Sequence, residues 1–329
     1  MDASFGPKLY YRHSGEFSAG GLVIALLAGL AVGLPCAWLY AWLIHWNPFI
    51  YIDIVASLGF GGIVGLAVES SLVSHKCRNV PLTALVAFVA ILISYYASWA
   101  VWLHALRGQP TLTLLLHPAA MWQVILDVNE KGAWTLRGSV VNGIPLWIAW
   151  ILEAGFIVGA AVVLALQAMQ QATYCESCDR FAKITPGVCY AGAGQAPPIT
   201  DKAAFKSYQK GLKQQGAELK RHLENKDLAF LEQLGAVQLD AIAWYQLDLV
   251  SCPQCNMTNT LRVVQLANKI EGKKIRNETA QTEVLRQLLL SSTEAESLRK
   301  LGQQLSPLLP RLVQERARQA QKAAAAAQS

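Results

Sequence analysis

The sequence predicts an all-α membrane bundle of four transmembrane helices, followed by a small α+β cytosolic domain containing a split zinc ribbon and helices. Two observations lead to this fold class. Of 329 residues, 53% are apolar and only 15% are charged, whereas soluble domains carry about 25% charged residues. Two C-x-x-C pairs lie in the second half, outside every long apolar run. This composition argues against a single soluble core, a disordered chain or a secreted disulfide scaffold.

Four apolar runs are long enough to cross a membrane. Each holds about 25 residues, where a hydrocarbon core of about 30 Å needs roughly 20. The runs are Gly20–Ile44, Phe49–Val73, Pro81–Leu106 and Ile144–Met169. Asn47-Pro48 is a turn signal, so we expect the first two spans to form a tight hairpin. A transmembrane domain is therefore predicted over residues 20–170, after an N-terminal tail over residues 1–19.

Basic residues in the short loops predict the orientation. The second loop contains Lys76 and Arg78, whereas the first contains neither Lys nor Arg. The N-terminal tail, the second loop and the C-terminal half are therefore predicted to be cytosolic. The extracytoplasmic loop, residues 107–143, faces the other side. Within it, Pro118–Glu130 is predicted to form an amphipathic helix at the membrane interface.

Glycines recur four residues apart on the first two spans. Gly29 and Gly33 share one helix face, and Gly61 and Gly65 share another. This spacing lets a neighbouring helix backbone approach closely. We expect these faces to pack within the bundle, with a homodimer contact as the alternative.

Three carboxylates lie within the predicted spans. Asp53 and Glu69 are near span ends, whereas Glu153 is nine residues into the fourth span, roughly 13 Å deep at about 1.5 Å per residue. A carboxylate at that depth costs a few kcal/mol, so we expect it to be protonated, paired or lining a cavity. It is either a proton or cation relay or a structural group with a hydrogen-bond partner. Candidate partners are Ser57, Ser94 and Tyr95.

Three histidines and two carboxylates fall on the predicted outer side. They are His45, His104, His117, Asp127 and Glu130. Together they could form a metal or proton site, but their spacing fits no ligand motif. Neutral or solvated imidazoles are the simpler interpretation.

The two C-x-x-C pairs predict one structural zinc ion per chain. The ligands are Cys175, Cys178, Cys252 and Cys255. Four thiolates complete a tetrahedron and leave no position for a catalytic water. A redox disulfide and an iron–sulfur centre are the alternatives. Cys189 lies nearby and could replace one ligand.

The flanks of the second pair favour a zinc ribbon. Residues 243–250 and 258–266 alternate in the manner of strands. Because 73 residues separate the two pairs, the ribbon is predicted to be split. We assign residues 171–267 to this domain, with a helical insertion over residues 200–235. An apolar stripe on that insertion faces away from its lysines.

Residues 268–329 are predicted to be a helical, basic C-terminal region. A helix is expected over Thr279–Leu290, on the spacing of its leucines. A second helix is expected to begin with a capping box of Thr293 and Glu296.

Four short motifs lie within and between the first three spans. They are Tyr10-Tyr11-Arg12 with Ser14-Gly15, Pro48-Phe-Ile-Tyr51, Gly59-Phe-Gly-Gly62 and Lys76-Cys-Arg-Asn79. Together they resemble a group of uncharacterised bacterial multi-pass inner-membrane proteins. The resemblance implies a bacterial inner membrane and carries no activity with it.

Several catalytic motifs are missing from the sequence. There is no P-loop, no G-x-G-x-x-G that opens a helix after a strand, no H-E-x-x-H and no G-x-S-x-G. We therefore expect a non-enzymatic scaffold or adaptor that contacts membrane lipids and recruits another protein subunit or a second copy. Too few basic and aromatic residues flank the ribbon to predict nucleic-acid binding. The alternatives are a transporter or channel subunit using Glu153, and a membrane enzyme using the outer-side histidines and carboxylates.

Overall fold

The computed structural model describes residues 9–47, 49–136, 138–194, 202–238, 241–271 and 274–305. The chain forms two compact units. One unit is His13–Ala172, and the other joins the chain from Thr173 onward to the segment that ends at Arg12. The sequence placed residues 1–19 together as one tail. The structure instead divides this segment, because Leu9 and Tyr11 hydrogen-bond to a strand of the C-terminal unit.

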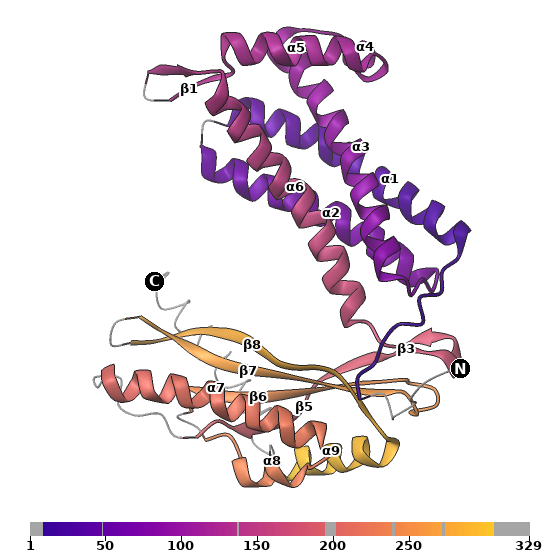
Figure 1. The fold of residues 1–329 in the computed structure, drawn as a ribbon, viewed down its shortest axis with the longest axis vertical. Coiled ribbons are helices and arrows are strands. Elements are labelled where there is room, and N and C mark those ends of the chain that lie inside the picture. The colour runs from indigo at the N-terminus through magenta and orange to yellow at the C-terminus, as the bar shows by residue number, and fades with distance from the viewer. Residues whose placement is uncertain are drawn as a thin grey trace, which may run out of the picture. The chain divides into compact units, whose positions relative to one another are not determined.

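Four helices are long and apolar enough to span a membrane (Figure 1). They are α1 (Ala19–Trp46), α2 (Ile50–Ser74), α3 (Val80–Arg107) and α6 (Ile144–Gln171). The ends of all four agree with the predicted runs to within two residues. Ser18 accepts a hydrogen bond from the Gly21 N–H at the start of α1, and Asn79 accepts one from the Leu82 N–H at the start of α3. These side chains pair backbone donors that a helix N-terminus otherwise leaves open. Pro48 of the predicted turn lies outside the described residues.

The predicted glycine faces contact neighbouring helices of the same chain. A Cβ atom on Gly61 would overlap the carbonyl oxygen of Ile157, and one on Gly65 would overlap that of Ala161. Both carbonyl groups belong to α6, so only a hydrogen atom at these positions of α2 permits the approach. Two positions of α1 lie equally close to α2 and α3, namely Gly29 and Gly33.

Two short helices and a hairpin fill the connection between α3 and α6. They are α4 (Thr111–Leu116), α5 (Pro118–Lys131), β1 (Trp134–Leu136) and β2 (Ser139–Val141). Helix α5 is where the sequence predicts an amphipathic helix. Its Ile125 is buried, whereas Trp122 and Leu126 are exposed. One face of α5 therefore packs inside the bundle unit and another faces outward.

The C-terminal unit is built on a four-stranded antiparallel sheet. Its strands follow one another in chain order, as β5 (Lys183–Gly192), β6 (Ala243–Ser251), β7 (Asn259–Glu271) and β8 (Lys274–Leu290). The two strand-like flanks of the second cysteine pair are β6 and β7. A separate small ladder joins β3 (Tyr174–Cys175) to β4 (Arg180–Phe181). The sequence analysis did not anticipate β5 or β8.

Three helices cover one face of this sheet (Figure 1). They are α7 (Lys202–Glu224), α8 (Ala229–Leu234) and α9 (Ser292–Leu305). Leu219 and Leu223 of α7 are buried in one apolar cluster with Tyr245 and Leu247 of β6. Burial of side chains of this size stabilises a fold by about 1.5–3 kcal/mol each. The predicted helical insertion is thus two helices rather than one.

The predicted helical C-terminal region, residues 268–329, is wrong for its first part. Thr279–Leu290, expected as a helix, belongs to the long strand β8. Helix α9 follows it. Residues 306–329 lie outside the described residues.

Two irregularities in β8 explain the error. Val263 pairs with Leu285 and Leu261 with Leu288, so two steps along β7 oppose three along β8. Gln287, within the extra step, has a left-handed backbone with φ of 54°. A bulge of this kind changes which side chains face the core. Leu285 and Leu288 are therefore both buried although they are three residues apart, a spacing typical of a helix.

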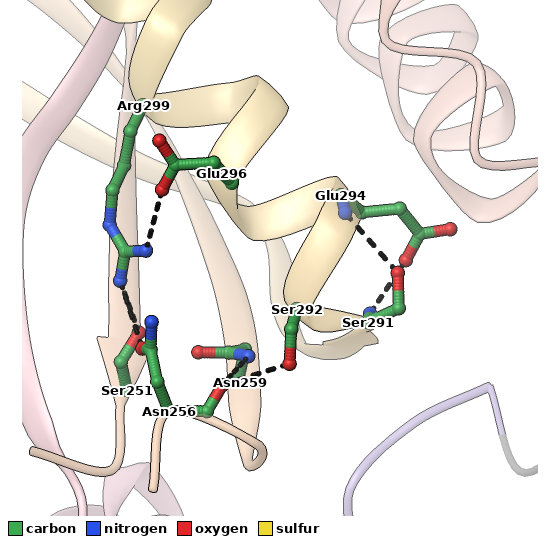
Figure 2. A network of polar contacts seen from close by, with 8 residues as sticks. All are labelled: Ser251, Asn256, Asn259, Ser291, Ser292, Glu294, Glu296 and Arg299. Atoms are coloured by element: carbon green, nitrogen blue, oxygen red, sulfur yellow. Dashed lines mark hydrogen bonds and ion pairs between the residues drawn. The ribbon is translucent and has the colours of Figure 1, made fainter. Parts of the chain in front are cut away.

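The capping box of α9 is also shifted from its predicted place. Ser291 Oγ accepts from the Glu294 N–H (3.2 Å), and the Ser291 N–H donates to Glu294 Oε2 (2.7 Å), as Figure 2 shows. This is the reciprocal arrangement expected of Thr293 and Glu296, moved by two residues. Glu296 instead pairs with Arg299.

Candidate metal centre

The structure brings the four predicted cysteine ligands together. Cys175 ends β3, and Cys178 ends the 3₁₀ turn Glu176–Cys178. Cys252 and Cys255 lie in the turn between β6 and β7. All four Sγ atoms lie within 4.8 Å of one another, and those of Cys175 and Cys255 are 3.5 Å apart. Among the described residues, this is the one group of three or more Cys, His, Asp or Glu side chains that could hold a metal ion.

The donor set fits one structural metal ion. A tetrahedral zinc site with Zn–S bonds of about 2.3 Å places its sulfur atoms about 3.8 Å apart, close to the separations in this cluster. None of the seven cysteines, all of them described, forms a disulfide. Four protein thiolates would fill the coordination shell, so such an ion would hold the fold together rather than bind a substrate.

Backbone hydrogen bonds favour the thiolate form in the second pair. The Met257 N–H donates to Cys255 Sγ (3.4 Å), which lowers the pKa of that thiol. Burial opposes ionisation of Cys252, but the backbone N–H groups of Cys255 and Gln254 outweigh it and lower its pKa to about 6. The first pair differs, because a hydrogen bond with Cys255 raises the pKa of Cys178 to about 12. The cluster therefore carries thiolate charge at neutral pH, the form that binds a metal.

The other cysteines lie outside the cluster. Cys189 is fully buried within β5, and burial raises its pKa to about 12. It is therefore a neutral thiol in the core and does not replace one of the four ligands.

No protein-family model, curated protein or solved structure matches the chain. The likeness to bacterial multi-pass proteins remains an expectation from the sequence. The metal-ligand assignment rests on the geometry of the four thiols.

A second polar cluster joins three of the apolar helices. Tyr40 of α1 donates a hydrogen bond of 2.5 Å to Glu153 of α6, and its hydroxyl is 2.9 Å from Ser57 Oγ of α2. Phe60 stacks on the Tyr40 ring, with ring centres 5.1 Å apart. The sequence singled out Glu153 and Ser57 but missed Tyr40, which reads as one member of an aromatic belt. The contact joins residues 113 positions apart, so no local pattern reveals it.

The remaining candidate carboxylates and histidines do not form a site. Glu69 lies near the C-terminal end of α2, apart from Glu153. His104 and His117 bond to the nearby carbonyl groups of Gln109 and Thr113. His45 contacts the ring of Trp42. Asp127 pairs with Arg107 and Lys131. Each of these outer-side polar groups with a recorded contact is thus held locally, and they do not gather into a metal-binding group.

Proposed function

We propose that this chain is a scaffold or adaptor subunit of a bacterial inner membrane, without enzymatic activity of its own. Its four apolar helices anchor it, and its cytosolic domain holds one structural zinc ion in a split zinc ribbon. That domain recruits a partner protein. A thiol cluster of this kind suits the reducing cytosol, where cysteine pairs more often bind metal than form disulfides.

The pairing of the N-terminal segment supports a common side for both ends of the chain. The Tyr11 N–H donates to the Gln287 carbonyl (2.9 Å), and the Leu289 N–H donates to the Leu9 carbonyl (3.0 Å). Segments that share a sheet lie on the same side of a membrane. An even number of spans must therefore separate them, which agrees with four helices. Lys76 and Arg78 in the loop between α2 and α3 favour the cytosol for that side.

The observation that carries the scaffold proposal is an exposed basic stripe on α7. We define this basic stripe as Lys206, Lys210, Lys213, Lys220 and Arg221, all of which are exposed. At 3.6 residues per turn they lie within about a third of the helix circumference. The opposite, apolar face of α7 is already buried in the domain core. The helix therefore offers its charge to a partner while it keeps its leucines in the fold.

The chemistry of the stripe fits an acidic protein surface. Insertion into lipid would require an exposed apolar face on α7, but Leu212, Leu219 and Leu223 are buried. Nucleic-acid binding to single strands would require exposed aromatic rings beside the cations. Phe205 and Tyr208 instead pack toward the domain, each only partly exposed.

Purification from native membranes in a gentle detergent tests the proposal. We expect a second protein in a fixed ratio, identified and counted by mass spectrometry. The triple change Lys206→Gln, Lys210→Gln and Lys213→Gln should release it. The matched triple change to Arg keeps the charge and should retain it. A homo-oligomer with no second protein, or a partner that the Gln variant retains, would contradict recruitment through α7.

The polar cluster within the bundle supports a second candidate function. Glu153, Tyr40 and Ser57 come from three different helices, and intramembrane carboxylates commonly serve proton or ion movement. We infer that a transporter or channel subunit would use Glu153 as its relay. The change Glu153→Gln should then abolish flux, or growth that depends on the protein, while the fold stays intact. Unchanged function in that variant would exclude this role.

A further inference from the structure

The two cysteine pairs end in the same unusual backbone conformation. The residue directly after each second cysteine is left-handed, Asp179 with φ of 50° and Asn256 with φ of 54°. This conformation costs a residue other than glycine roughly 1–2 kcal/mol. Aspartate and asparagine adopt it more readily than other residues with side chains. Each turn therefore aims two thiols at one point at an energetic cost, and contacts from elsewhere must offset it.

Helix α9 supplies these contacts to the second pair. Arg299 Nη2 donates to Asn256 Oδ1 and to Ser251 Oγ, both at 3.2 Å (Figure 2). Ser292 Oγ donates to the Asn256 carbonyl at 3.1 Å. The backbone and the side chain of Asn256 are thus both held from α9, about 40 residues further along the chain. The capping box at Ser291 fixes the N-terminus of the helix beside these contacts.

The N-terminal segment supplies the corresponding contacts to the first pair. The Tyr174 hydroxyl donates to Asp179 Oδ1, and Tyr174 is itself almost fully buried. The backbone N–H of Tyr174, directly before Cys175, donates to the hydroxyl oxygen of Tyr11 (3.0 Å). Tyr11 is fixed in turn by its backbone bond to Gln287 of β8. A residue that precedes all four apolar helices therefore reaches the residue beside the first ligand.

We propose that Tyr11 and Arg299 are positioning residues of the metal centre, one for each cysteine pair. This inference rests on the proposed metal site and assigns its surrounding shell. Groups that orient the ligands of a metal site typically contribute 10–100-fold to metal affinity. Because linkage is reciprocal, a bound metal also stabilises the docked N-terminal segment and α9.

Zinc affinity of the full-length protein in detergent tests the assignment. Competition with a chelator of known affinity gives the dissociation constant. We expect Tyr11→Phe and Arg299→Ala each to weaken zinc binding at least tenfold. Two neighbours are matched controls. Tyr10→Phe removes the adjacent hydroxyl, which bonds to Glu224 on α7, and Lys300→Ala removes an exposed charge from α9. Both controls should bind zinc like the wild type.

Two further measurements separate positioning from general stability. The visible spectrum of the cobalt-loaded protein reports the ligand geometry, and it should change in Tyr11→Phe and Arg299→Ala but not in the controls. The effects of Arg299→Ala and Asn256→Gly should be less than additive, since both remove one contact. Equal affinities and spectra in all variants, with a zinc-binding wild type, would overturn the positioning roles alone. A wild type that binds neither zinc nor cobalt would overturn the metal centre itself.

Discussion

The α carbon of Gly61 lies so close to the carbonyl oxygen of Ile157 that a single added carbon would overlap it. Four residues further along α2, Gly65 stands in the same relation to Ala161. Backbone-to-backbone contact therefore fixes the distance between α2 and α6. Glu153 lies on α6 one turn before Ile157, so this contact also sets the position of the polar cluster.

Gly61→Ala should destabilise the bundle by about 1–3 kcal/mol, because overpacking forces the two helices apart. Gly59→Ala is the matched control on the same helix, since its Cβ would meet nothing within 4 Å. Unfolding of the purified protein by a denaturing detergent, followed by circular dichroism, measures both. Equal stability of the two variants would contradict the close approach of α2 to α6.

Cys175→Ser or Cys252→Ser should abolish zinc binding, because three thiolates no longer close the tetrahedron. Elemental analysis of the purified chain should fall from one zinc to none. Cys189→Ala is the control and should retain one zinc, since its thiol lies in β5 outside the cluster. Loss of zinc in the Cys189 variant would show that the ligand set is misassigned.

Removal of zinc by a strong chelator should unfold the C-terminal unit and leave the four apolar helices intact. The binding energy of a structural zinc contributes directly to the folding free energy of a small domain. Hydrogen–deuterium exchange should therefore rise in β6 and β7, but not in α1 or α3. Protection that persists throughout the sheet after zinc is gone would contradict a structural role.

Tyr40→Phe should lower the stability of the bundle by about 1 kcal/mol, because Glu153 and Ser57 both lose the same hydroxyl partner. Tyr51→Phe is a suitable control, since Tyr51 is 80% exposed. The detergent unfolding assay used for Gly61 applies here. A Tyr40 variant as stable as the Tyr51 variant would indicate that the carboxyl group has another partner.

Ser291→Ala should destabilise α9 by about 1 kcal/mol, the usual cost of a lost N-cap. Thr293→Ala should cost less, because the capping box uses Ser291 and Glu294. Thermal unfolding of the zinc-loaded protein compares the two variants. A larger loss at Thr293 would restore the cap predicted from the sequence.

Local patterns predicted some elements of the fold and failed for others. The apolar spans were predicted to within two residues, because length and hydropathy are properties of contiguous segments. The strands on either side of the second cysteine pair were also found. Strand β8 was read as a helix, since its bulges place Leu285 and Leu288 on one face at helical spacing. The sequence contains the residues of a bulge but not the partner strand that makes it one.

The sequence by itself determined the four apolar helices and the identity of the four thiols. Both depend on segments short enough for composition and spacing to specify. Only the tertiary structure decided that the two cysteine pairs meet, that Tyr40 bonds to Glu153, and that Tyr11 and Arg299 reach the two turns. These contacts join residues tens to more than a hundred positions apart. Their partners are chosen by the packing of whole helices and strands, because a hydrogen bond acts over about 3 Å and carries no trace in the local sequence.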